Sequence, residues 1–232
     1  MSRQLPRGPV AMVPVTNAYD LDCRRCVRLA AFLDDVHAAH PSYFCRPVPP
    51  FGDANARLVI VGLAPGMHGA NATGRPFTGD YAGIILYETL HKYGFATKAQ
   101  STGVEDGLEL VDARITNAVK CLPPGNKPLP AEIRTCNAYL ARELDGVGPG
   151  SAILALGRIA HDATLLAFGL PSRGHAFAHA GEHALPRGVR LFDSYHCSRY
   201  NTNTRRLTTP MFEQVFAAIV RHLSAPATAK LG

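Results

Sequence analysis

Short apolar runs alternate with helix-like segments along most of this chain, and this alternation restricts the fold more than any other feature. The runs lie at 57–62, 111–120, 151–157 and 189–195, and their Val, Ile and Leu content is typical of buried strands. Helices are expected at 22–40, 84–93, 131–144, 158–168 and 211–223. Strands that alternate with helices form a mostly parallel sheet, so we expect an α/β fold with four strands and helices on both faces.

The length and composition are those of one globular domain. Of the 232 residues, 47% are hydrophobic and 18% charged, which argues against both a disordered chain and a membrane protein. We assign 21–224 to one domain, 1–20 to a loosely ordered lead-in and 225–232 to a tail. The N-terminus lacks the continuous apolar segment of a signal peptide, which predicts a cytoplasmic protein. A formal net charge of +6 is compatible with a polyanionic partner.

A glycine-rich loop at 62–80 follows the first predicted strand, and glycines let a backbone approach a ligand closely. The loop matches neither common phosphate-binding pattern, which weakens a nucleotide-binding interpretation. Phe77 is either a plug of the core or a stacking surface, and Asp80 either caps the next helix or points at a substrate. Loops that follow parallel strands share one edge of a sheet, so we expect this loop to meet 121–130 and 196–207.

The six cysteines show no sign of a secreted disulfide framework. Four of them could share a site, namely Cys23 and Cys26 in a C-x2-C pair, with Cys121 and Cys136 downstream. Four thiolates suit zinc or an iron–sulfur cluster, but from spacing alone buried free cysteines are an equally good interpretation. Cys197 beside His196 raises a nucleophilic interpretation, which we disfavour because sequence neighbours at a strand end usually point in different directions.

Three separated segments, read together, resemble one family. They are GLAPGMHGANATGRPFTGD (62–80), NAVKCLPPGNKP (117–128) and SYHCSRYNTNTRRLT (194–208). With four cysteines at matching places, they resemble the uracil-DNA glycosylase superfamily, above all its family 5 type, with the iron–sulfur-bearing family 4 type next. Leu63 stands where the family 4 pattern has an acidic residue, which favours family 5. The resemblance runs from about Cys23 to the last helix.

This resemblance implies a three-layer αβα sandwich around a four-stranded, mostly parallel sheet. It implies a structural [4Fe–4S] cluster, whose ligands would be Cys23, Cys26, Cys121 and Cys136. It also implies a monofunctional DNA glycosylase of base excision repair, which flips out uracil and other deaminated bases such as hypoxanthine and xanthine and hydrolyses the N-glycosidic bond. We expect a monomer that acts on nucleoid DNA in a prokaryotic cytoplasm.

The motifs also imply individual roles. The catalytic set is Asp80, in the chemical step, Asn126, and His196, which faces O2 of the base. Phe77 matches the ring that stacks on the extruded base. Asn117 stands where family 4 has its base-reading asparagine, and its presence leaves the strength of the preference for uracil open. Further base contacts are expected from Gly62, Leu63, Ala64 and Gly66, and DNA contacts from Arg75, Ser198, Arg199, Asn201, Arg205 and Arg206.

The reaction needs donors for the negative charge of the leaving base and a carboxylate on the far side of the sugar. A neutral His196 and the backbone N–H groups of 63–66 could supply the donors, and Asp80 the carboxylate. Two hypotheses compete, a non-catalytic iron–sulfur protein that binds nucleic acid and a nucleotide-binding α/β enzyme without need of cysteines. The basic loop after His196 could equally be an ordinary solvated loop. No lysine stands out in the motifs, so no lyase step is expected.

Overall fold

The computed structural model describes residues 20–225, and the expected lead-in and tail fall almost entirely outside this range. Within it, one mixed sheet has the strand order β1-β3-β2-β4-β6-β5. The strands are β1 (Phe51–Gly52), β2 (Leu58–Gly62), β3 (Ala113–Asn117), β4 (Ala152–Leu156), β5 (Glu182–Ala184) and β6 (Arg190–Ser194). The four central strands run parallel, which confirms the predicted α/β class and parallel core.

Two edge strands make the sheet larger than predicted. β1 pairs antiparallel with β3, and β5 pairs antiparallel with β6, so the sheet has six strands where four were expected. β1 has two residues and β5 three, which is too short for an alternating apolar pattern to be recognised. β3 is shorter than the predicted 111–120. It begins after Asp112, which has a φ of +52° and accepts a hydrogen bond from the Arg57 backbone N–H.

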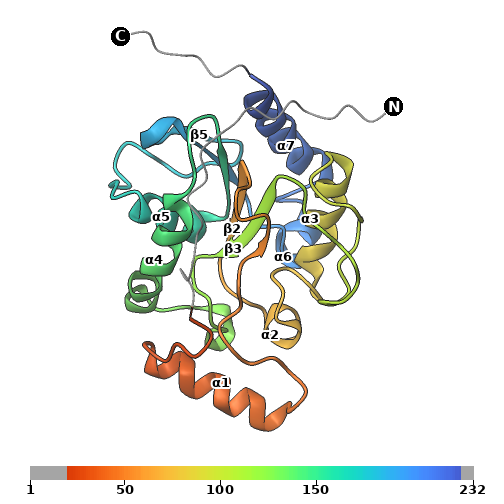
Figure 1. Ribbon diagram of the computed structural model, residues 1–232, viewed down its shortest axis with the longest axis vertical. Coiled ribbons are helices and arrows are strands. Elements are labelled where there is room, and N and C mark those ends of the chain that lie inside the picture. Colours follow the sequence, from red (N-terminus) through yellow and green to blue (C-terminus); the bar gives the residue numbers. More distant parts are fainter. Residues whose placement is uncertain (1–19, 226–232) are drawn as a thin grey trace.

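The helices cover both faces of the sheet and one end of the molecule (Figure 1). They are α1 (Val27–Ala39), α2 (Ala70–Thr73), α3 (Tyr81–Lys92), α4 (Pro130–Asp145), α5 (Arg158–Ala167), α6 (Arg199–Asn203) and α7 (Thr209–Ser224). Single turns of 3-10 helix lie at Pro124–Asn126 and Pro186–Gly188. The five long helices were predicted to within a few residues at most of their ends. α2 and α6 lie in segments predicted as loops, because four or five residues carry too little helical periodicity.

The parallel strands send alternate side chains into two separate cores. Leu58 and Ile60 of β2 belong to the core beneath α3 and α7, whereas Val59 and Val61 belong to the core beneath α4 and α5. All five residues of β2 are buried, as a strand covered on both faces requires. The two cores place helical layers on both sides of the sheet, which is the three-layer arrangement (Figure 1).

α1 lies apart from these layers and forms a third core with residues from elsewhere in the chain. Its Leu29 and Leu33 pack with Leu122 and Tyr139. The predicted helix 22–40 was too long at its start, because residues 21–22 form a turn, in which the Asp20 carboxylate accepts from the Asp22 backbone N–H, and 23–25 are not helical. The C-x2-C pair therefore lies in the segment that leads into α1, with its second cysteine directly before the first helical residue.

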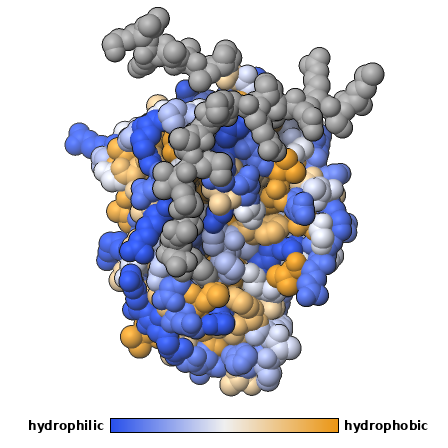
Figure 2. Space-filling model, in the orientation of Figure 1, coloured by the Kyte–Doolittle hydropathy of each residue, from blue (hydrophilic) through white to orange (hydrophobic). Residues whose placement is uncertain are grey.

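The surface mixes residue types. On the face shown in Figure 2, hydrophobic residues are interspersed with hydrophilic ones. The most exposed large apolar side chains include Val27, 80% exposed on α1, and Tyr200, 72% exposed on α6. None of the helices within 20–225 combines the length and the apolar character needed to cross a lipid bilayer.

Candidate active site

The loops that follow β2, β3 and β6 border one cavity of about 650 Å³. It lies at the carboxyl edge of the parallel strands, where open α/β sheets bind their ligands. The predicted residues that border it are Leu63, Ala64, Gly66, Phe77, Asp80, Asn117, Asn126, His196, Ser198 and Arg199. Segments that are more than 100 residues apart in the sequence thus meet at one place, as the sequence predicted from the topology.

Gly62 ends β2 and leaves room for two cavity residues to pack against the strand. A Cβ atom at this position would lie 2.4 Å from Asn117 Oδ1 and 2.8 Å from two atoms of the Phe77 ring. Phe77 has a φ of +54°, in the left-handed region that disfavours a bulky side chain, and it is only 6% exposed. The missing side chain of Gly62 thus leaves the space that the Asn117 and Phe77 side chains occupy at the cavity.

His196 lies beside Phe77 and is held as a neutral imidazole. The centroids of the two rings are 5.9 Å apart and their planes differ by 28°. Burial lowers the pKa of His196 to about 4, so near neutral pH the ring carries one N–H donor and no charge. The Asn201 side chain donates a hydrogen bond of 2.8 Å to the His196 carbonyl oxygen and so fixes the backbone from which the ring projects.

Asp80 caps a helix, as one interpretation of the sequence predicted, and it also borders the cavity, so the cap does not exclude a role toward a ligand. Its Oδ1 accepts a hydrogen bond of 3.0 Å from the Gly83 backbone N–H at the start of α3. Its Oδ2 lies against the glycine loop, where a Cβ at Gly69 would come within 2.6 Å. Burial raises the pKa of Asp80, although backbone N–H groups of α3 oppose the shift.

Two asparagines complete the cavity wall, and they differ in exposure. Asn117, the last residue of β3, is 3% exposed, and its Oδ1 is buried without a hydrogen-bond partner in the described structure. An unpaired buried acceptor is costly unless a ligand satisfies it. Asn126 is exposed and has a φ of +57°, in the 3-10 turn that follows Pro123.

The four cysteines of the predicted ligand set come together around one hollow at the end of the molecule that carries α1. Cys23, Cys26, Cys121 and Cys136 all border it. Burial raises the pKa of all but the first of these thiols, that of Cys26 to about 11, and proximity of the sulfurs to one another adds to the shift. The thiolate forms of these four cysteines would repel one another. A cationic centre bound between them would stabilise the thiolates, so the four cysteines are a suitable set of ligands for one.

The other two cysteines lie outside this group. Cys197 is fully buried and burial raises the pKa of its thiol, so it does not have the exposed, easily ionised sulfur of a nucleophile. Cys45 is buried as well, and its sulfur receives a hydrogen bond of 3.4 Å from the Asn71 side chain. The burial of Cys197 argues against a nucleophilic pair with the neighbouring His196.

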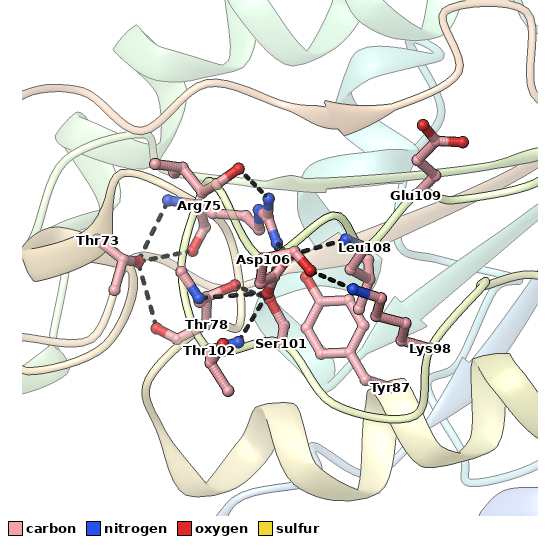
Figure 3. A network of polar contacts seen from close by, with 12 residues as sticks. Thr73, Arg75, Thr78, Tyr87, Lys98, Ser101, Thr102, Asp106, Leu108 and Glu109 are labelled. Carbon is pink, nitrogen blue, oxygen red and sulfur yellow. Dashed lines mark hydrogen bonds and ion pairs between the residues drawn. The ribbon is translucent and has the colours of Figure 1, made fainter.

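Arg75 is the clearest departure from the predicted site. It was expected to contact phosphate, but its side chain is 6% exposed and pairs with Asp106 at 2.8 Å. Figure 3 shows Arg75 among its polar partners, and its guanidinium also donates to Ser101 Oγ and to the Val104 carbonyl oxygen. The guanidinium carbon lies 4.4 Å over the Phe51 ring. The structure therefore does not support a phosphate contact for Arg75, because its donors are directed into the protein.

The basic loop after His196 is folded into α6 and divides into two kinds of residue. Ser198 caps α6 by accepting a hydrogen bond from the Asn201 backbone N–H, and both residues are partly buried. Arg199, Arg205 and Arg206 are exposed. The arginines are available to an outside ligand, whereas Ser198 and Asn201 already have partners within the loop.

Seven further residues border the cavity without having been predicted, and three of them carry large side chains. Met67 and His68 lie within the glycine-rich motif, and Tyr81 is the first residue of α3. His68 Nδ1 is hydrogen-bonded to the Tyr43 hydroxyl at 2.9 Å, and the Tyr81 ring lies 5.1 Å from the Arg199 guanidinium carbon. Their position inside or directly after a motif was the one available signal, since their residue types alone indicate no role.

A second group of ligand-type side chains lies under β5 and β6. His161, His183 and Asp193 have ligand atoms within 4.8 Å of one another. His161 Nδ1 lies 2.8 Å from Asp193 Oδ1, and its Nε2 lies 2.8 Å from the His175 carbonyl oxygen. A carbonyl oxygen can only accept, so Nε2 carries a proton. Burial acts to lower the pKa of His161, but its hydrogen bond to Asp193 raises the pKa overall.

Comparison with known proteins identifies the family of the chain. A family model described as the uracil DNA glycosylase superfamily matches residues 49–221. The chain is 46% identical over 198 residues to a type-5 uracil-DNA glycosylase of Thermus thermophilus, covering 83% of this chain and 90% of that protein. It is 42% identical over 211 residues to a type-5 uracil-DNA glycosylase of Pyrobaculum aerophilum, covering 89% and 90%. A type-4 uracil-DNA glycosylase of Archaeoglobus fulgidus is 36% identical over 141 residues, covering 60% and 57%.

Proposed function

The chain belongs to the uracil-DNA glycosylase superfamily, and from this premise we propose that it excises uracil from DNA by hydrolysing the N-glycosidic bond. One observation carries the proposal. An aromatic ring, a neutral imidazole and a carboxylate, from Phe77, His196 and Asp80, border the same cavity. These are the groups needed to hold an extruded base, receive its negative charge and act on the opposite side of the sugar.

The base is held in this proposal by a ring and an amide. Phe77 supplies a stacking surface, worth roughly 1–3 kcal/mol for one base, which offsets part of the few kcal/mol that unpairing and unstacking require. Asn117 Oδ1, buried and unpaired, is suited to accept the imide N–H of uracil. Backbone groups of 62–66 complete the pocket around the base.

His196 stabilises the leaving base. When the bond to C1′ breaks, negative charge develops on the base and its O2 becomes a strong acceptor. A neutral imidazole donates one hydrogen bond to that oxygen without needing to lose or gain a proton. The lowered pKa of about 4 keeps His196 in this neutral form throughout the physiological range.

Asp80 acts on the sugar. Its ionised carboxylate offsets the positive charge that develops at C1′ and orients or deprotonates the attacking water. The bond to the Gly83 N–H leaves Oδ2 available on the side of the glycine loop. Asn126, exposed at the rim, is proposed to assist in placing the water or the sugar.

Other deaminated bases are proposed as substrates as well. The cavity of about 650 Å³ is large enough to admit a purine, which favours hypoxanthine and xanthine as additional substrates. Asn117 does not exclude these purines, because its Oδ1 can accept from the N1–H of hypoxanthine or xanthine as well as from the N3–H of uracil. We propose that uracil ranks first, because a purine must occupy more of the same cavity, and that the deaminated purines follow.

A structural [4Fe–4S] cluster is proposed at the four cysteines. Four thiolates around zinc, each at about 2.3 Å, would bring the sulfurs to about 3.8 Å from one another. Across residues 20–225, no three of the four cysteine sulfurs lie within 4.8 Å of each other, which suits a larger group. The Lys120 backbone N–H donates to Cys136 Sγ at 3.3 Å, a contact typical of thiolates that hold a cluster. When bound, such a group would tie the turn before α1 to 121–136.

The DNA strand is proposed to lie across the rim near α6, where Arg199, Arg205 and Arg206 are exposed and can contact phosphates. Ser198 and Asn201 are proposed to contribute mainly by holding this loop and the His196 backbone. We place the reaction in base excision repair of prokaryotic chromosomal DNA, carried out by a monomer.

One assay tests the proposal against its competitor. Labelled oligonucleotides carrying uracil, hypoxanthine, xanthine or a damaged cytosine are incubated with the protein, and the released base is identified by chromatography. The proposal expects free uracil, with smaller amounts of hypoxanthine and xanthine, and no strand cleavage. A non-catalytic nucleic-acid-binding protein would instead bind the oligonucleotides in a salt-sensitive way and release nothing.

A further inference from the structure

We propose that Asp106, acting through Arg75, is a positioning residue that holds Phe77 in place for base stacking. The inference rests on the proposed function, because it assumes that Phe77 stacks on the extruded base. Asp106 lies in the loop 97–108, which the sequence motifs left without a role and which does not border the cavity. Polar contacts link this loop to Arg75 and Thr78, which lie on either side of Phe77 in the sequence (Figure 3).

Phe77 needs such support because its backbone is in an unfavourable conformation. A φ of +54° is rare for an aromatic residue and persists only where the surroundings impose it. Both neighbours of Phe77 are held. The Tyr87 hydroxyl of α3 donates to the Pro76 carbonyl oxygen at 2.8 Å, and Thr78 Oγ1 lies 2.7 Å from Ser101 Oγ. The turn at Phe77 is thus held from α3 on one side and from the loop 97–108 on the other.

Asp106 organises that loop around Arg75. Its Oδ1 receives hydrogen bonds of 2.8 Å from Arg75 Nη1 and from the Leu108 N–H, and its Oδ2 receives one of 2.8 Å from the Thr102 N–H. Burial alone would raise the pKa of Asp106, but the Arg75 guanidinium and these N–H donors lower it well below its usual range. The carboxylate is therefore ionised, and it is the counter-charge of a guanidinium that is only 6% exposed.

Loss of this charge would be transmitted to Phe77. A buried guanidinium without its carboxylate is unstable in place and moves toward water, and Arg75 is two residues from Phe77. The Phe77 ring has no room to adjust, because it packs on Gly62, and the Phe77 carbonyl oxygen lies 1.9 Å from where a Cβ at Gly83 would be. A small shift of the turn therefore displaces the stacking surface, while Asp80 and His196 keep their own supports.

The test compares Asp106→Asn with wild type on two substrates under single-turnover conditions. In a duplex with uracil opposite adenine, extrusion is unfavourable and only a small fraction of the uracil is extruded. Any stacking energy that is lost therefore lowers that fraction by the corresponding factor. In a single strand the base is already unpaired, so the same loss has little effect. We expect uracil release from the duplex to slow about tenfold, and release from the single strand to slow less than about twofold.

Two variants accompany it. Ser101→Ala removes the contacts to Arg75 and Thr78 without leaving an unpaired charge, and we expect an intermediate slowing on the duplex, about threefold. Asp112→Asn is the matched control, because Asp112 pairs with Arg57 Nε at 2.7 Å at the opposite, amino end of β2. That variant should release uracil from both substrates at the wild-type rate.

The outcomes separate this inference from the proposed function. Equal slowing on both substrates, in proportion to the unfolded fraction measured by thermal denaturation, would reduce Asp106 to a purely structural role and overturn the inference. So would wild-type rates for Asp106→Asn on the duplex. If the wild-type protein releases no uracil, the proposed function fails instead. The inference is then decided by the fluorescence of a 2-aminopurine placed next to the uracil in the duplex. This fluorescence must rise less when Asp106→Asn binds than when the wild-type protein binds.

Discussion

A methyl group added at Gly62 should disable the site while leaving the backbone unstrained. The φ of Gly62 is not in the left-handed region, so Gly62→Ala introduces no conformational penalty of its own. The new Cβ would lie 2.4 Å from Asn117 Oδ1 and 2.8 Å from the Phe77 ring. To restore a contact of about 3.4 Å, the amide must move about 1.0 Å and the ring about 0.6 Å. Displacements of this size in a positioned group are associated with losses of about 10²-fold in rate.

The assay is single-turnover release of uracil, with thermal denaturation in parallel. We expect Gly62→Ala to lower the rate by about 10²-fold, and overpacking to lower the free energy of unfolding by about 1–3 kcal/mol. Gly148→Ala is the control, because a Cβ there meets nothing within 4 Å. Wild-type release by a folded Gly62→Ala protein would refute the reasoning, since it would mean that neither Phe77 nor Asn117 needs its observed position.

Three other results are expected. Because burial raises the pKa of Asp80, kcat/KM measured against pH should fall on the acid side at a pH above the ordinary carboxyl range of about 4, and the protonation of His196 should not limit the rate above that pH. Burial works to lower the pKa of His161, but Asp193 raises it overall. The contribution of this pair to the free energy of unfolding should therefore be complete below about pH 6.5 and be lost as pH rises through the folded-state pKa of His161. The free energy of unfolding of His161→Gln, measured by denaturation at several pH values, should lack this dependence. Cys23→Ser should lose a broad visible absorption band that Cys45→Ser retains, and equal spectra would contradict the assignment.

The sequence predicted the central architecture well because the signals were local. β2 has five consecutive buried residues, four of them with apolar side chains, and α3 begins after Asp80, which caps it. The edge strands β1 and β5 were not predicted, because a segment of two or three residues is too short to show an alternating apolar pattern. Their pairing depends on neighbours that a local pattern does not report.

The site residues that lie in sequence motifs could be predicted. The position of a side chain could not be predicted where it depends on a contact with a residue far away in the sequence. The motifs brought Phe77, Asp80 and His196 to one cavity, as expected. Arg75 was predicted to contact DNA, because it lies within the glycine-rich motif. Its burial depends on Asp106, 31 residues later in a loop without a motif, and long-range ion pairs leave no trace in local composition.

The central claim is that one extruded base is enclosed by the three loops of the cavity. The most direct test is a crystal structure of the protein with a duplex whose deoxyuridine carries a 2′-fluorine, which slows cleavage of the bond. We expect the uracil ring on Phe77, its O2 within hydrogen-bond distance of the His196 imidazole, and the Asp80 carboxylate beside C1′ on the opposite face of the sugar. A uracil that remains stacked in the duplex, or that lies outside the cavity, would contradict the account.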